Sequence, residues 1–349
     1  MTENNVLLSI RDLSVSFSTD EGPVKAVNSV SYEVKEGMTL AVVGESGCGK
    51  TVTALSILQL IPDPPGKIDN GEILFRGVDL ACADGRKMRR IRGNDIAMIF
   101  QEPETCLNPV YTVGDQIVEA IELHQNKRAA AAWEHAVKML RMVGIDDPEQ
   151  RANEYPHQLS GGMRQRIMIA MALSCCPSLL IADEPTTALD VTIQAQILEL
   201  LRRLQKKNNM SIILITHDLA VVAENADDVA VMYASKIVET SAVESIFDDP
   251  LHPYTRALLR SLPRIGGKKD RLEVIDGNIP DRLDFPQGCK FHPRCAIGFD
   301  DARCKRNEPQ LREVKAGRCV ACWYANGYET EDEFKKYETE YGKHKEISG

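Results

Sequence analysis

The residues with the clearest chemical meaning form the glycine-rich stretch Gly44-Glu45-Ser46-Gly47-Cys48-Gly49-Lys50-Thr51. It follows an apolar run at residues 39–43 and precedes a helical pattern at residues 52–60, the strand, loop and helix order that a phosphate-binding loop needs. Glycines let successive backbone N–H groups converge on phosphate oxygens at the positive end of a helix. We expect Lys50 to reach the terminal phosphates of a nucleotide and the Thr51 hydroxyl to hold Mg²⁺.

Two adjacent acids, Asp183 and Glu184, end the apolar run at residues 179–182. Neighbouring residues of a strand point to opposite faces, so the two carboxylates can have different roles. We expect Asp183 to support Mg²⁺ through water and Glu184 to act as the general base on an attacking water. An acid pair alone could cap a helix, but an acid pair downstream of a phosphate loop indicates a nucleotide hydrolase.

Three further residues are candidates by position. Gln101 follows the predicted strand at residues 96–100, and its amide can ligate Mg²⁺ and sense the γ-phosphate. His217 follows the predicted strand at residues 211–216, where it could contact the γ-phosphate and hold the attacking water. Phe17 could stack on an adenine ring, although a core position is equally consistent with the periodicity.

Ser160-Gly161-Gly162 opens a helical pattern and forms a second anion-binding N-terminus in the same chain. One nucleotide needs only one such cradle from each chain. We therefore expect this one to serve a nucleotide held by a partner subunit, in a head-to-tail dimer with two nucleotides at its interface.

The remaining pattern predicts an α/β fold. Short alternating runs at residues 7–17, 25–27 and 30–34 indicate antiparallel strands, and helical patterns at 113–123 and 129–143 indicate a helical insertion between residues 101 and 158. From residue 160, helices alternate with strands, which is typical of a parallel sheet covered on both faces. The net charge of −9 argues against nucleic acid as the main partner. No apolar stretch approaches the ~20 residues that span a bilayer and no signal peptide is visible, so we expect a cytosolic location.

Cysteines gather near the C-terminus, at Cys289, Cys295, Cys304, Cys319 and Cys322. In a cytosolic chain such a cluster indicates a metal site or reactive thiols rather than disulfides. Four thiolates suit either Zn²⁺ or a [4Fe–4S] cluster, and the spacing does not decide between them. Elsewhere, Cys48 lies near Lys50 at a helix N-terminus, which predicts a lowered thiol pKa. We expect alkylation of Cys48 to block nucleotide hydrolysis and bound nucleotide to protect the thiol.

Taken in order, these motifs resemble the Walker A, Q-loop, signature, Walker B, D-loop and switch histidine of ABC ATPases, with the D-loop at Ala188-Leu189-Asp190. The resemblance covers residues 6–260 and implies a P-loop, RecA-like nucleotide-binding domain with an antiparallel β subdomain and a helical insertion that docks onto membrane subunits. The signature ends in Met163, where the family norm is glutamine, but its serine and both glycines are retained. The resemblance implies catalytic roles for Glu184, His217, Lys50 and Gln101, Mg²⁺ at Thr51, Gln101 and Asp183, and ATP contacts at Phe17, Gly44, Glu45, Ser46, Gly47, Cys48, Gly49, Lys50, Thr51, Thr53, Gln101, Ser160, Gly161, Gly162, Asp183 and Asp190.

Finer features at residues 108–114, 164–166 and 249–259 resemble the ATPase subunits of dipeptide and oligopeptide importers, specifically the D-type member of an unlike pair. This resemblance implies a small C-terminal lobe whose [4Fe–4S] cluster is held by Cys289, Cys295, Cys304 and Cys322, unless Cys319 replaces one of them. It also implies an F-type ATPase partner, two membrane permease subunits, an extracytoplasmic solute-binding protein, and a peripheral position on the cytoplasmic face of the membrane.

The domains we expect are a nucleotide-binding domain at residues 1–264 with its insertion at about 102–160, a cysteine-rich domain at 265–328 and a charged tail at 329–349. Alternatives are the same role in a nickel or other small-solute permease, a soluble ABC ATPase that acts on DNA or ribosomes, and a nucleotide-gated regulator that does not hydrolyse ATP.

Overall fold

The structure is a computed structural model that describes residues 5–102, 106–125, 127, 130–186, 190–261, 275–278 and 280–325. The D-loop residues Ala188 and Leu189, the linker at 265–274 and the charged tail lie outside the described residues.

The main sheet has the strand order β11-β12-β10-β9-β3-β8-β7-β6. Its strands are β3 (Thr39–Val43), β6 (Ile96–Ile99), β7 (Leu179–Asp183), β8 (Ser211–Thr216), β9 (Asp228–Tyr233), β10 (Lys236–Ala242), β11 (Arg312–Lys315) and β12 (Arg318–Val320). The strands from β9 to β6 are mutually parallel, and β10, β12 and β11 add antiparallel pairs at one edge. Every residue of β3, β7 and β8 is buried, as expected for parallel strands covered on both faces.

A second, antiparallel sheet has the order β2-β1-β4-β5, formed by β1 (Val6–Thr19), β2 (Gly22–Lys35), β4 (Gly66–Phe75) and β5 (Val78–Asp79). The two short runs expected at residues 25–27 and 30–34 belong to one strand, β2. Its register against β1 shifts between Val30 and Val27, and Ser29 adopts a φ of 50° there. The extra residue is a β-bulge, which interrupts the alternation without ending the strand.

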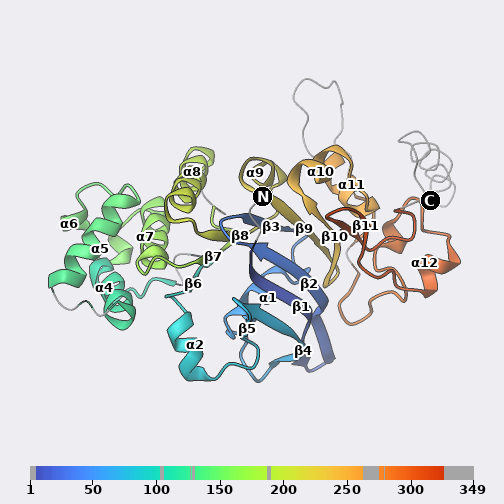
Figure 1. Cartoon of the computed structure of the whole chain (residues 1–349), viewed down its shortest axis with the longest axis horizontal. Helices are drawn as coiled ribbons and strands as arrows, with labels where there is room; N and C mark the ends of the chain where they lie inside the picture. Colours follow the sequence, from blue (N-terminus) through green and yellow to red (C-terminus); the bar gives the residue numbers. More distant parts are fainter. Residues whose placement is uncertain are drawn as a thin grey trace.

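The helices between β6 and β7 gather at one end of the molecule, in green in Figure 1. They are α4 (Val113–His124), α5 (Ala130–Met142), α6 (Pro148–Arg151), the 3₁₀ turn η1 (Pro156–Gln158) and α7 (Gly161–Leu173). The first two agree with the helical patterns at residues 113–123 and 129–143. Their buried faces share one apolar cluster with β6, β7 and α8 (Val191–Asn208).

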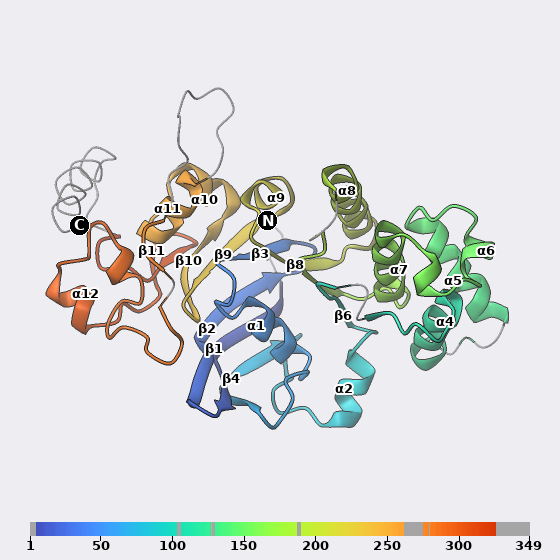
Figure 2. The same cartoon turned by 180° about the vertical axis from the view of Figure 1, so that it is seen from behind.

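Four of the other helices lie on the two faces of the main sheet. Figures 1 and 2 show α8, α9 (Leu219–Asn225) and α10 (Val243–Asp248) along one face, with α1 (Lys50–Ile57) and the antiparallel sheet on the other. The remaining helices are α2 (Gly85–Ile91), α11 (Pro253–Arg260), η2 (His292–Arg294) and α12 (Ala302–Arg306). Within the described residues, no helix is both long and apolar enough to cross a membrane.

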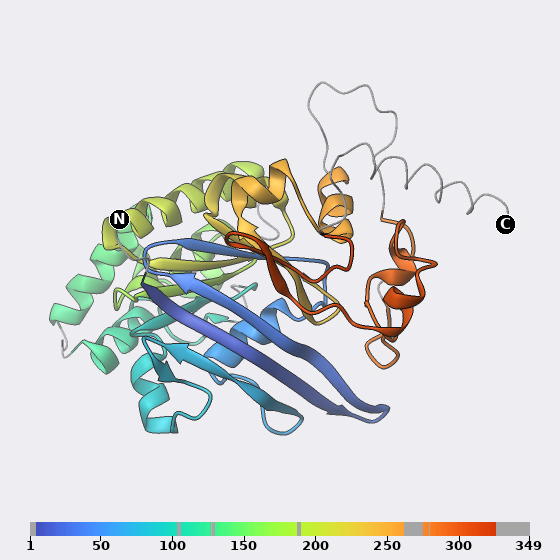
Figure 3. The same ribbon diagram turned by 45° about the vertical axis from the view of Figure 1, so that its right-hand side comes forward.

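The C-terminal segment, residues 280–325, extends the main sheet. β12 pairs with β10, so that Val320 lies opposite Glu239 and Cys319 opposite Thr240. Figure 3 shows this orange and red segment at the end of the sheet opposite the green helices. Two short strands therefore lie in the segment that the sequence marks only by its cysteines, and their four- and three-residue lengths leave little periodicity to detect.

Candidate active site

The phosphate loop joins β3 to α1, as its sequence context predicts. Gly44 has a φ of 154°, and a Cβ at this position would lie 2.1 Å from the carbonyl oxygen of Met232. Gly49 caps α1 with a φ of 109°, and a Cβ there would lie 2.4 Å from the carbonyl oxygen of Ala26. Both positions require glycine because a side chain would be strained and would overlap neighbouring backbone.

Lys50 is buried and points back over the loop. Its Nζ donates to the carbonyl oxygens of Gly44 at 2.8 Å and Glu45 at 3.1 Å. The Thr53 hydroxyl donates to the carbonyl oxygen of Gly49 at 2.9 Å. The loop thus holds an ammonium group at the end of β3, where the phosphates of a nucleotide would meet it.

Asp183 ends β7, and its carboxylate is only 2% exposed. Burial raises its pKa, while a hydrogen bond from Thr51 and the charge of Lys50 act in the opposite direction. Its Oδ1 is buried with no hydrogen-bond partner among the described residues. Carboxylate and hydroxyl oxygens are ligands that Mg²⁺ uses, so Asp183 and Thr51 fit a magnesium site.

Glu184 lies at the centre of a hydrogen-bonded trio. Gln101 Nε2 donates to its Oε2 at 3.0 Å, and His217 Nδ1 lies 3.2 Å from its Oε1. The Glu184 side chain is 16% exposed and that of His217 is 66% exposed, so water can reach the trio. Glu184 has a φ of 46°, a backbone strain of the kind found at functional sites.

The signature residues Ser160–Gly162 lie at the start of α7, on a different part of the fold from the phosphate loop at the start of α1. Ser160 caps α7, where its hydroxyl accepts the Met163 N–H at 3.3 Å. α7 packs against α4, α5 and β6, whereas α1 packs against β2 and β7. Gly161 is exposed and a Cβ there would meet nothing within 4 Å, so this N-terminus is accessible from outside the chain.

Two other residues expected to contact nucleotide, Asp190 and Phe17, contact other parts of the chain in this structure. Asp190 caps α8, where its Oδ1 accepts the Ile193 N–H at 2.9 Å. Phe17 lies on β1 opposite Gly66, and a Cβ on that glycine would lie 2.7 Å from the ring. The half-buried ring therefore packs over Gly66, where the inner strands β1 and β4 of the antiparallel sheet pair.

The expected low pKa of Cys48 is wrong. The side chain is 3% exposed, and burial raises the thiol pKa. Lys50 and the backbone N–H groups act to lower it, but desolvation of a thiolate in this position outweighs them. Position at a helix N-terminus predicts a reactive thiol only where the sulfur is also accessible to solvent.

Four of the C-terminal cysteines, Cys289, Cys295, Cys304 and Cys322, line one small cavity. All are free thiols. Burial raises their pKa values, to about 12 for Cys304 and for Cys322. Cys319 lies instead on β12 and lines a different cavity.

The sulfur atoms of these cysteines do not form a metal site in this structure. Among the described residues, no group of three or more His, Cys, Asp or Glu side chains is arranged to hold a metal ion. The structure therefore supports the ABC ATPase part of the expected fold but not an iron–sulfur lobe. The shared cavity nevertheless brings four thiols together, which is the donor set that an iron–sulfur cluster requires.

Sequence reasoning missed three side chains at the phosphate loop. The Tyr254 hydroxyl accepts the Glu45 N–H at 3.1 Å, and Arg294 forms an ion pair with the Glu45 carboxylate. Arg282 lies over Gly47, where a Cβ would be 2.4 Å from its Nη2. These residues are more than 200 positions from the loop, and nothing in the local pattern indicates the contact.

Comparison with known proteins agrees with this geometry. The chain matches the family described as ABC transporter over residues 27–187 and the family described as Oligopeptide/dipeptide transporter, C-terminal region, over residues 238–304. It is 52% identical over 316 residues to the dipeptide transport ATP-binding protein DppD of Haemophilus influenzae, covering 90% of this chain and 94% of the relative. It is 50% identical over 319 residues to the oligopeptide transport ATP-binding protein AppD of Bacillus subtilis, covering 91% and 97%.

Solved structures give the same result. The dimeric, post-hydrolysis ATP-binding cassette MJ0796 bound to ADP and Pi is similar with a TM-score of 0.61 and 25% identity, over 68% of this chain and 98% of that chain. The cbiO1 protein of Clostridium perfringens, part of the ABC transporter complex cbiONQ, gives a TM-score of 0.58 and 25% identity, over 70% and 92%. The chain belongs to the ABC transporter family of ATP-binding cassettes, in the branch that carries the C-terminal region of oligopeptide and dipeptide transporters.

Proposed function

We propose that this chain is the ATP-hydrolysing subunit of a membrane transporter that imports dipeptides or oligopeptides. The observation that carries the proposal is the placement of Glu184 between Gln101 and His217, beside Asp183 and at the same sheet edge as the phosphate loop. Curated relatives about half identical to the chain are named as dipeptide and oligopeptide transport ATP-binding proteins, which supports the peptide class.

ATP would bind with its phosphates in the loop at residues 44–51. Lys50 would exchange the carbonyl oxygens of Gly44 and Glu45 for the terminal phosphate oxygens, since a charged acceptor makes the stronger hydrogen bond. Thr51, Asp183 and Gln101 would hold Mg²⁺, which neutralises charge on the phosphates when bound. Phe17 would contact the adenine.

Glu184 would act as the general base. Its carboxylate is oriented by Gln101 and His217, accessible to water and placed one residue after the magnesium carboxylate. A water held by Glu184 and His217 would attack the γ-phosphate, Glu184 would accept its proton, and Lys50 would stabilise charge on the transferred group. The exposed imidazole of His217 is free to turn toward that phosphate.

The exposed N-terminus of α7 supports a head-to-tail dimer. Ser160, Gly161 and Gly162 would meet the γ-phosphate of a nucleotide bound by the partner, and Asp190 would contact the same interface. We propose an unlike, F-type ATPase as that partner and two permease subunits contacted through the helical insertion. The chain would thus work at the cytoplasmic face of the membrane. An extracytoplasmic solute-binding protein would deliver the solute to the permease subunits and would act on this chain only through them. We do not propose nucleic acid as a partner.

We also propose that Cys289, Cys295, Cys304 and Cys322 hold a [4Fe–4S] cluster. Their common cavity and the resemblance to D-type importer subunits support this proposal. The sulfur atoms would have to draw together around the cluster. Such a cluster would tie together a segment whose only strands are the short β11 and β12 among the described residues.

We expect Glu184→Gln to reduce steady-state ATP hydrolysis by about 100-fold or more, because glutamine keeps the shape but cannot accept a proton. Binding of Mg-ATP, measured by fluorescence titration, should be retained. The matched control is Glu199→Gln on the exposed side of α8, which should hydrolyse ATP like the wild type. Normal turnover by the Glu184 variant would remove this residue from the role of base.

The peptide class is tested by uptake. Proteoliposomes that contain the chain with its ATPase partner and permease subunits, supplied with the solute-binding protein outside and ATP inside, should accumulate radiolabelled dipeptide. Lys50→Ala should abolish accumulation, because the terminal phosphates lose their ammonium partner. ATP-dependent uptake of Ni²⁺ without uptake of peptide would contradict the peptide assignment while leaving the ATPase assignment intact.

The cluster is tested by anaerobic purification with iron and sulfide analysis and an absorption spectrum. We expect about four iron and four sulfide per chain, lost in Cys322→Ser and retained in Cys319→Ser. Stoichiometric zinc without iron, or no metal in the wild type, would contradict the cluster. Loss of iron in the Cys319 variant alone would identify Cys319 as a ligand.

A further inference from the structure

A buried arginine joins the cysteine-rich segment to the phosphate loop. Arg294 ends η2 and immediately precedes Cys295, and its side chain is 6% exposed. Its Nη1 donates to Glu45 Oε2 at 2.9 Å and its Nη2 donates to Glu45 Oε1 at 3.2 Å. The two parallel hydrogen bonds form a fork, the arrangement that gives an arginine–carboxylate pair both strength and a fixed geometry.

The remaining donors of Arg294 fix its orientation. Nε donates to the carbonyl oxygen of Asp276 at 3.0 Å, Nη2 to that of Ile275 at 3.4 Å, and Nη1 to the Tyr233 hydroxyl at 3.3 Å. An ion pair whose guanidinium is buried is stabilising only where such additional hydrogen bonds offset the loss of water. The guanidinium therefore has one well-defined position, and so does the carboxylate that it holds.

Glu45 is held from several sides. Arg294 binds its carboxylate, the Tyr254 hydroxyl accepts its N–H at 3.1 Å, and its carbonyl oxygen accepts from Lys50 at 3.1 Å. Arg282, from the same C-terminal segment, lies over Gly47 in the same loop. The C-terminal segment thus contacts two residues of a loop whose backbone N–H groups are the expected phosphate ligands.

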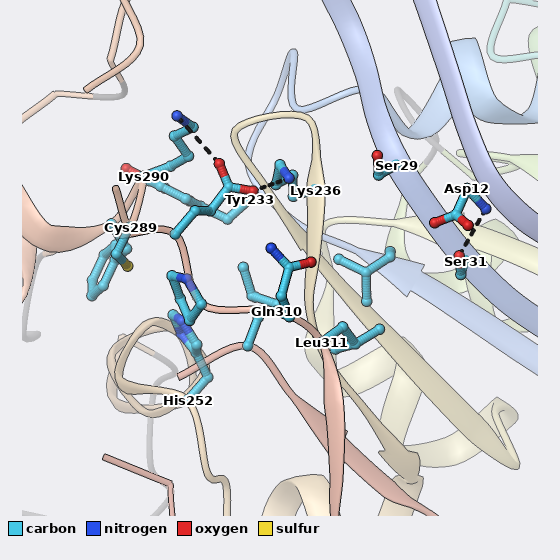
Figure 4. Close-up of a pocket in the computed structure, with 16 residues that line it drawn as sticks. Asp12, Ser29, Ser31, Tyr233, Lys236, His252, Cys289, Lys290, Gln310 and Leu311 are labelled. Carbon is cyan, nitrogen blue, oxygen red and sulfur yellow. Dashed lines mark hydrogen bonds and ion pairs between the residues drawn. The ribbon is translucent and has the colours of Figure 1, made fainter. Parts of the chain in front are cut away.

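The segment that carries Arg294 is itself firmly docked. Phe291 packs edge-on against Tyr233 with ring centroids 5.2 Å apart, and the Tyr233 and Tyr254 rings lie 4.7 Å apart. Glu308 forms ion pairs with Lys236 of β10 and with Lys290. Figure 4 shows the cavity of about 160 Å³ that remains where this segment meets β10 and the antiparallel sheet, beside Lys236, Lys290 and Cys289.

We infer that Arg294 is a positioning residue for ATP binding. By fixing Glu45, it holds the phosphate loop in the shape that receives the nucleotide, so that ATP affinity depends on the C-terminal segment. The alternative is that the ion pair only anchors the segment. Loss of Arg294 would then lower stability and leave nucleotide affinity unchanged.

The test uses the full chain and a fluorescent ATP analogue titrated in the presence of Mg²⁺. We expect Arg294→Ala to raise the Kd about tenfold, because an unpaired Glu45 carboxylate would leave its half-buried position and shift the loop. Arg294→Lys should recover only part of the affinity, since lysine lacks the fork. Arg306→Ala, at an exposed position in the same segment, is the matched control and should bind like the wild type.

A double-mutant cycle separates positioning from general disturbance. Glu45→Gln keeps the side-chain size and should also raise the Kd, while the double variant with Arg294→Ala should be no worse than either single variant because both remove one interaction. In steady-state hydrolysis, the loss should fall on KM more than on kcat. Circular dichroism and thermal melting establish that each variant is folded.

The inference is overturned if the Kd of Arg294→Ala stays within about twofold of the wild type while its melting temperature falls. It is also overturned if Glu45→Gln and Arg294→Ala have additive effects on the free energy of ATP binding. If Arg294→Ala does not fold, unchanged affinity in Glu45→Gln and Arg294→Lys is sufficient to reject it. The nucleotide titrations and the melting curves can be carried out whether or not the cysteines hold a metal.

Discussion

The site depends on the adjacency of four parallel strands, β3, β8, β7 and β6. The carboxyl ends of parallel strands meet at one edge of a sheet, where open α/β folds bind their ligands. β3 runs into the phosphate loop, β8 into His217, β7 into Asp183 and Glu184, and β6 into Gln101. Residues that lie up to 173 positions apart, from Gly44 to His217, therefore meet because neighbouring strands share a direction.

This arrangement explains the contacts around Glu184. Gln101 and His217 follow the strands on either side of β7, so their side chains approach the carboxylate from opposite directions. Asp183, one residue earlier, belongs to the strand itself and is buried, whereas Glu184 leaves the strand with a positive φ. One step along the backbone thus separates a carboxylate suited to a metal ion from a carboxylate suited to water.

The C-terminal segment reaches the same site from the β10 side of the main sheet, away from β6. β12 pairs with β10, and the chain between α11 and β11 passes the end of β9, where Tyr233 lies against Arg294. The segment therefore contacts the phosphate loop as well as carrying the cysteines. Arg294 is next to Cys295, one of the four cysteines proposed as cluster ligands, so a change at those thiols would act close to the carboxylate of Glu45.

The sequence predicted the elements that have strong local signals. The phosphate loop, the strand that ends in Asp183 and the helices α4 and α5 follow from glycine spacing, apolar runs and helical periodicity. The joining of two short runs into β2 could not be predicted, because the bulge at Ser29 breaks the alternation. Arg294 and Tyr254 at the loop were missed because long-range contacts leave no local pattern, and the pKa of Cys48 was misjudged because burial is a tertiary property.

The most direct test of the central claim is a structure of the chain with Mg²⁺ and a non-hydrolysable ATP analogue. We expect Lys50 Nζ to leave the carbonyl oxygens of Gly44 and Glu45 for the terminal phosphates. The Thr51 hydroxyl should face the metal ion together with Asp183 Oδ1, which has no hydrogen-bond partner in the part of the chain that the structure describes. Glu184 should face a water at the γ-phosphate. A nucleotide bound elsewhere, or bound with Lys50 still on its own loop and Asp183 turned away from the metal, would contradict the central claim.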